Sequence, residues 1–131
     1  MNHCGDCALC CRLLAVTELD KPRDSWCRHC RPAAAAPCTI YGTRPQPCRQ
    51  FECLWLEHRQ TPGLEALPTA LRPNRCHVMF TGDGAGGLLA HVDPDHPDAW
   101  KRPLPAGIIA RARQAGDPVT IRCGERSWRL T

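Results

Sequence analysis

Apolar and polar residues alternate along part of the C-terminal half, and this pattern predicts a β-hairpin. Every second residue from Cys76 to Phe80 is apolar or cysteine, and a glycine-rich turn follows at 82–87. The apolar stretch 87–92 then supplies the return strand. A phosphate-binding loop is disfavoured because no Lys-Ser/Thr pair follows the glycines, which lead into a strand rather than a helix.

The next stretch predicts a helix and a second hairpin. Apolar residues recur at helical spacing over 108–115, and Gly116, followed by an Asp-Pro pair, marks the end of the helix. Over 119–123 the apolar residues alternate with polar ones. Residues 124–125 fit a two-residue turn, and the return strand holds Trp128.

Large apolar residues are scarce in the N-terminal half, where prolines interrupt any periodicity. This pattern predicts loops with short helical turns. One longer helix is expected over 47–60, because Phe51, Leu54 and Trp55 follow one another at helical spacing after a proline suited to the first turn. Such a helix would place Cys48 at its N-terminus, where the macrodipole favours a thiolate.

Together these elements predict an α+β protein with a single domain over residues 1–131. Residues 1–60 form a cysteine-rich, metal-bound region of loops and short helices. Residues 70–131 form a small region with the order β-hairpin, helix, β-hairpin. The apolar content of the first region is too small for a core of its own, and a structural metal would supply the missing stability.

Charge and hydropathy exclude several classes of function. Lys and Arg number 17 against 13 Asp and Glu, and the net charge of +4 is spread thinly, so the sequence carries no strong nucleic-acid signal. No apolar run approaches the length of about 18 residues that a membrane span needs. The chain starts at Met1 and reaches Cys4 without the basic and apolar regions of a leader, which predicts a cytoplasmic protein.

The distinctive feature is the cysteine content: 11 cysteines, an odd number, in a chain expected to stay in a reducing compartment. Disulfides are therefore disfavoured and metal ligation is favoured. The nine clustered cysteines are the candidate metal ligands: Cys4, Cys7, Cys10, Cys11, Cys27, Cys30, Cys38, Cys48 and Cys53. The other two, Cys76 and Cys123, have apolar neighbours on predicted strands and are expected to be buried small hydrophobes.

The spacing of these cysteines leaves two kinds of metal centre open. Pairs separated by two residues, such as Cys27 and Cys30, occur both in zinc ribbons and in iron–sulfur loops. Zinc, as one or two ions, is the first choice, and full thiolate ligation would make it structural in a binding or adaptor module with a protein partner. An iron–sulfur cluster with a redox, metal-handling or enzyme-accessory role is the alternative.

Two motifs carry a resemblance to a known family. The first is Cys-x2-Cys-x2-Cys-Cys at residues 4–11, and the second is Cys-x2-Tyr-x2-Arg-Pro-x2-Cys-Arg at residues 38–49. Over residues 4–53 the chain therefore resembles the CxxCxxCC family of zinc- or iron-chelating domain proteins. The resemblance implies a metal or iron–sulfur centre and supplies no reaction. Cys27 and Cys53 have no clear place in the family pattern.

The remaining signals are weaker. Five arginines lie near cysteines, where their N–H groups would stabilise thiolates: Arg12, Arg28, Arg31, Arg44 and Arg49. Asp93, Asp95 and Asp98 are expected to be turn and helix-cap residues rather than calcium ligands. No catalytic constellation follows from the spacing, so whether the protein is an enzyme is left open.

Overall fold

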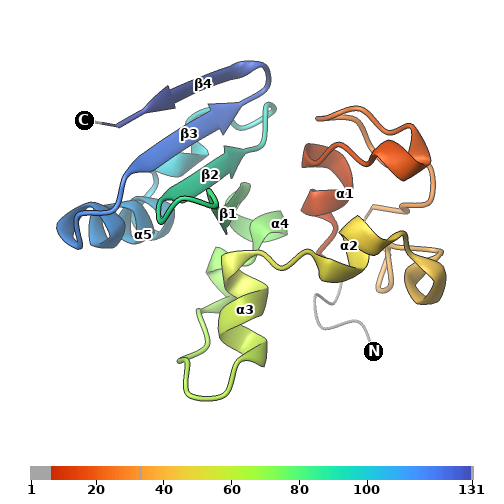
Figure 1. Ribbon diagram of the computed structural model, residues 1–131, viewed down its shortest axis with the longest axis horizontal. Coiled ribbons are helices and arrows are strands. Elements are labelled where there is room, and N and C mark those ends of the chain that lie inside the picture. Colours follow the sequence, from red (N-terminus) through yellow and green to blue (C-terminus); the bar gives the residue numbers. More distant parts are fainter. Residues whose placement is uncertain (1–6, 33, 131) are drawn as a thin grey trace.

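The computed structural model describes residues 7–32 and 34–130, and it has a mixed helix and strand fold, as the sequence predicts (Figure 1). The strands are β1 Val78–Gly82, β2 Leu88–Val92, β3 Val119–Cys123 and β4 Arg126–Arg129. The α-helices are α1 Leu9–Leu13, α2 Gln46–Gln50, α3 Leu54–Gln60, α4 Pro73–Cys76 and α5 Pro103–Gln114. Short 3-10 helices are η1 Thr17–Leu19, η2 Tyr41–Thr43, η3 Thr69–Leu71 and η4 Ala99–Lys101. None of the helices in these described ranges has the length and apolar character needed to cross a membrane.

The four strands form one mixed sheet in the order β1-β2-β3-β4. Both predicted hairpins are confirmed: β1 pairs with β2 and β3 pairs with β4, each antiparallel. The hairpins are joined by parallel pairing of β2 with β3, in which Ala90 lies opposite Ile121. A parallel pair needs a crossover connection, and α5 lies within that connection.

The two faces of the sheet are covered by different parts of the chain. One face is apolar and packs on α5, with Val78, Val92 and Ile121 at most 1% exposed in a core that includes Ile109. On the other face of β1, Met79 is 1% exposed and belongs to a second core formed mainly by α1 and α3. The cysteine-rich half therefore packs against the sheet face that α5 does not cover (Figure 1).

The predicted helix over 47–60 is wrong: it is two short helices, α2 and α3, separated by extended residues 51–53. A continuous helix would put Cys48 and Trp55 within about 20° of each other on its surface, because they are seven residues apart. The break lets Cys48 face a cavity lined by cysteines while Trp55, 5% exposed, packs into the second core. Tertiary packing therefore overrides the helical periodicity.

The prediction of Cys76 on a strand is also wrong. Cys76 is the last residue of α4, and His77 caps that helix in a left-handed conformation (φ 61°) before β1 begins. Cys76 is nevertheless buried, as expected, at 6% exposure. Gly116 follows α5 at φ 84°, which confirms it as the residue that ends the helix.

Candidate metal centre

Six of the predicted cysteines line a single cavity of about 120 Å³ in the N-terminal half. They come from three separate segments: α1 with the two residues before it, the loop 27–38, and α2. The six are Cys7, Cys10, Cys11, Cys27, Cys38 and Cys48. The rest of the wall is mainly apolar and includes Leu14 and Phe51. The fold therefore brings residues far apart in the sequence to one thiol-lined cavity.

Backbone contacts hold these segments together. The N–H of Cys27 donates to the carbonyl of Cys11 at 2.9 Å, which ties the loop to the end of the first motif. Within the loop, the N–H of Cys30 donates to the carbonyl of Cys27 at 3.0 Å. Cys30 also pairs with Cys38 in an isolated antiparallel bridge. Cys30 thereby joins the cysteine cluster even though it does not line the cavity.

One backbone N–H in this loop points at sulfur. The N–H of His29 donates to Sγ of Cys27 at 3.4 Å. Such a bond arises because the tight turn of a Cys-x2-Cys pair directs its amides inward, and amide-to-sulfur bonds of this kind surround the ligands of metal sites. The geometry is therefore compatible with Cys27 as a metal-bound thiolate.

Electrostatics single out one thiol of the cluster. A hydrogen bond from Cys10 lowers the pKa of Cys11 to about 6, assisted by a hydrogen bond from Cys30 and by the charges of Lys21 and Arg44, while burial acts in the opposite direction. Burial and the neighbouring Cys11 thiolate raise the pKa of Cys30 to about 12. In the absence of metal, Cys11 is thus the preferred thiolate, and Cys30 stays protonated and donates a hydrogen bond to it.

A buried cation lies beside this group of thiols. Lys21 is 7% exposed, and its ammonium donates to the carbonyls of Arg12 at 3.0 Å and Pro22 at 3.1 Å, and also to that of Leu14. Burial lowers the pKa of Lys21, and the charges of Cys27 and Cys11 oppose that effect. The carbonyls and thiolates offset part of the desolvation cost of the ammonium.

The surroundings of Cys48 affect the pKa of its thiol. It lies in α2, a helix of only five residues. Burial, together with the neighbouring Cys11 and Cys27, raises the pKa of Cys48 rather than lowering it. Cys48 thus lies in the first turn of a helix, as expected, and burial has the largest effect on its thiol in the metal-free protein.

Two of the arginines near the cysteines donate hydrogen bonds to oxygen atoms. Arg44 donates to the carbonyls of Tyr41 at 2.9 Å and Cys48 at 3.3 Å, and its guanidinium lies 3.8 Å from the centre of the Tyr41 ring. It therefore fixes the shape of the second motif. Arg12 donates from Nη1 to the carboxylate of Asp93 at 2.6 Å.

One candidate ligand, Cys53, lies in different surroundings. Cys53 is 7% exposed in the second core, where burial raises its pKa, and it interacts electrostatically with Cys7. Cys76 interacts with both, so these three thiols form a second neighbourhood beside the cavity. Cys4, which the sequence also predicts as a ligand, lies outside the described residues.

The spacing of the thiols bears on the kind of centre they fit. In a tetrahedral zinc site with Zn–S bonds of 2.3 Å, the sulfurs are about 3.8 Å apart. Among the described residues, no three thiols lie within 4.8 Å of one another. The thiols of the metal-free protein are therefore not gathered as closely as the ligands of one bound zinc ion.

A different set of residues comes closer together, and the sequence analysis did not find it. His77, Asp93 and His96 have potential ligand atoms within 4.8 Å of one another. Asp93 was expected to serve only in a turn, and it does accept the N–H of Asp95 at 2.9 Å. The hairpin register was the available signal, because pairing of Val78 with Val92 brings His77 beside Asp93.

Chemically, a cavity with several thiols and apolar walls suits soft and borderline metal ions, or a cluster that contains sulfide. The mixed sheet positions this cavity through the second core. Compared with models of known families, with curated proteins and with solved structures, the chain gives no significant match.

Proposed function

We propose that the N-terminal half holds a metal centre ligated by cysteine thiolates, with zinc as the first candidate ion. The observation that carries this proposal is the single cavity lined by six thiols from three segments. Thiolates are the preferred protein ligands of zinc and of iron–sulfur clusters. The centre would be structural and would make this half a rigid binding module for a protein partner.

The architecture of the N-terminal half supports a stabilising role. Its helices α1 and α2 have five residues each, and short helices are marginal without tertiary packing. The second core reaches this region through Leu9 and Leu13 only at one end. A structural metal contributes on the order of 10 kcal/mol of apparent binding free energy, enough to order the intervening loops.

The resemblance of residues 4–53 to the CxxCxxCC family supports the same proposal. Arg44 contacts both Tyr41 and Cys48 of the second motif, so the motif forms one local unit. Lys21 and Arg44 supply positive charge near Cys11, which offsets part of the negative charge that several thiolates would bring. These contacts favour a binding role without indicating a reaction.

An iron–sulfur cluster is the second candidate, and one specific observation favours it. The cavity of about 120 Å³ has room for more than a single water molecule, and no three of the described thiols have sulfurs within 4.8 Å of one another. A cluster holds its thiolates further apart than one ion does, because several metal ions and sulfides lie between them. The function would then be redox chemistry, metal handling or service to an enzyme.

The deciding experiment is analysis of zinc, iron and acid-labile sulfide, with a visible spectrum, on protein purified without oxygen. Zinc without sulfide supports the structural zinc centre, and brown protein with iron and sulfide supports the cluster. Cys48→Ser should lower metal content, whereas Cys123→Ser, at the end of β3, should leave it unchanged. A metal-free wild-type protein, or equal metal content in the two variants, would overturn the proposal.

A further inference from the structure

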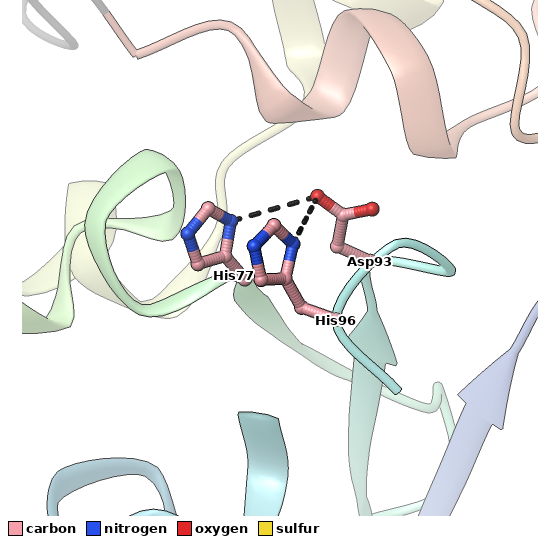
Figure 2. A group of neighbouring side chains, drawn as sticks. All are labelled: His77, Asp93 and His96. Atoms are coloured by element: carbon pink, nitrogen blue, oxygen red, sulfur yellow. Dashed lines mark ion pairs between the residues drawn. The ribbon is translucent and has the colours of Figure 1, made fainter. Parts of the chain in front are cut away.

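The group formed by His77, Asp93 and His96 has the geometry of a metal site outside the thiol cavity. Nδ1 of His77 and Nδ1 of His96 each lie 3.5 Å from the same carboxylate oxygen, Oδ2 of Asp93 (Figure 2). Ligands bound to one zinc ion at 2.0–2.1 Å are about 3.3 Å apart in a tetrahedral site. The nitrogen-to-oxygen separations are therefore close to those of ligands that share an ion.

Backbone contacts fix the positions of the three residues before any ion binds. His77 follows α4 in the left-handed conformation, and its carbonyl accepts the N–H of Asp93 at 3.0 Å. The N–H of His96 donates to the carbonyl of Asp93 at 2.8 Å, which closes a turn directly after β2. A group held in this way needs little reorganisation of the backbone to bind an ion.

One nitrogen in the group lacks a satisfactory partner. Nδ1 of His96 is buried and makes no hydrogen bond within the described part of the chain. A buried polar atom left without a partner is unfavourable, so such atoms usually have a role. Coordination to a metal would satisfy this nitrogen and would use its lone pair.

The other carboxylate oxygen of Asp93 already accepts two hydrogen bonds. Its Oδ1 accepts hydrogen bonds from Arg12 at 2.6 Å and from the N–H of Asp95 at 2.9 Å. These contacts orient the carboxylate so that Oδ2 faces the two imidazoles (Figure 2). Hydrogen bonds of this kind to a ligating carboxylate are typical of metal sites.

We propose that His77, Asp93 and His96 hold a first-row divalent transition metal ion with at least one coordination position left open. Two histidines and one carboxylate are the ligand set of catalytic zinc sites and of non-haem iron sites. With neutral imidazoles, the charges of Asp93 and Asp95 are balanced by those of Arg12 and Arg102, so the geometry of the three ligands, and not the net charge, supports the site. All three ligands lie outside the cysteine-rich half.

Binding requires one small rearrangement. The two imidazoles are stacked, with ring centres 3.6 Å apart and planes 8° from parallel. The lone pairs of the two Nδ1 atoms are therefore nearly parallel and do not converge on one point. For both to bind one ion, the two rings must rotate relative to each other. The side chain of His96 is 38% exposed and has room to rotate. This rotation would replace the contact between the rings with two metal–nitrogen bonds.

The test is titration of Co²⁺ into the full-length protein after its thiol sites have been loaded with Zn²⁺ and the zinc bound outside them has been removed with a chelator, because zinc would otherwise occupy the histidine site as well. His96→Gln is the main variant because His96 is partly exposed and its loss should leave the fold intact. His77→Gln is the second variant. His58→Gln is the matched control, since His58 lies on α3 and contacts the carbonyl of Glu65 instead. Bound cobalt per chain and the visible spectrum are measured after gel filtration.

Wild-type protein and His58→Gln should each retain one cobalt ion without a thiolate-to-cobalt absorption band. His96→Gln and His77→Gln should bind that ion about 100-fold more weakly or worse. Equal cobalt retention in His96→Gln and wild type, or a wild-type cobalt spectrum dominated by thiolate absorption, would overturn the site. The thiolate band reports the cysteine cavity separately, so failure of one proposal does not imply failure of the other.

Discussion

Arg12 donates from Nη1 to Oδ1 of Asp93 at 2.6 Å, and this contact links the end of the first cysteine motif to the first hairpin of the sheet. The two side chains are only 15% and 6% exposed, so the pair is largely desolvated. Arg12 also lies 3.0 Å from Asp95, whose side chain is 69% exposed. One guanidinium thus connects the two candidate metal sites.

Replacement of Arg12 by glutamine should destabilise the protein strongly, because it leaves the buried carboxylate of Asp93 without its cationic partner. The expected loss is about 3–5 kcal/mol of unfolding free energy, measured by urea denaturation. Asp95→Asn removes only the exposed partner and should cost less than about 1 kcal/mol. Similar losses in the two variants would show that burial of Asp93 does not set the cost.

Stability should fall as the pH decreases from about 6.5 to about 4 because of His91. Burial, with the charges of Arg122 and Arg23, lowers the pKa of His91 to about 4. Arg122 donates to Nδ1 of His91 at 3.3 Å, which fixes the neutral form of the ring. The unfolded chain, with an ordinary histidine pKa near 6.5, takes up the proton first, so the folded state loses about 3 kcal/mol across this interval.

Urea midpoints recorded at several pH values would measure this loss. His91→Gln keeps an acceptor for Arg122 but cannot be protonated, so its stability should change less over the same interval. A wild-type profile that matches the variant would show that His91 does not cause the acid sensitivity.

Removal of metal should loosen the cysteine-rich half and spare the sheet. Loops that depend on the centre lose their order without it, whereas the core between the sheet and α5 contains residues such as Val78 and Ile121 that are fully buried without any ligand. Hydrogen exchange after chelation should increase over 7–53 and remain slow in β1–β3. Uniform exchange across both regions would contradict the expectation.

Gly87→Ala should be destabilising, and Gly82→Ala, at the other end of the same turn, nearly neutral. A Cβ at Gly87 would lie 2.9 Å from the carbonyl oxygen of Pro118 and would displace the carboxylate of Asp83, which accepts two N–H groups of the turn. Overpacking of this kind costs about 1–3 kcal/mol. At Gly82 the added carbon has open space. Thermal melts of the pair would check the difference.

The sequence predicts the C-terminal half well, because its elements are defined locally. Alternation and turn glycines were enough to place both hairpins, and the spacing around Ile109 placed the helix between them. The boundary of α4 was missed because Pro73–Cys76 is too short to show a helical period. The break between α2 and α3 was missed because it serves packing, with Cys48 and Trp55 directed to different surroundings.

The candidate sites were predicted unevenly for a similar reason. The spacing of the cysteines predicts that their thiols lie close together, and six of them line one cavity. The spacing does not show that Cys53 belongs to the second core. His77 and Asp93 are neighbours only through strand register, which depends on how the hairpin folds. Side chains whose proximity depends on pairing across the sheet carry no local signature in the sequence.

The parallel pairing of β2 with β3 also has a consequence for the order of folding. Each hairpin forms around a short turn, which is a fast local event. Pairing of Leu88 with Val119 is slower, because it requires the crossover through α5 to form first. During synthesis β2 emerges first, so its edge, with Leu88, Ala90 and Val92 on the apolar face, stays unpaired until the last strands leave the ribosome. An unpaired apolar edge is a template for aggregation. Chains interrupted before Val119 are therefore the form of this protein most prone to self-association.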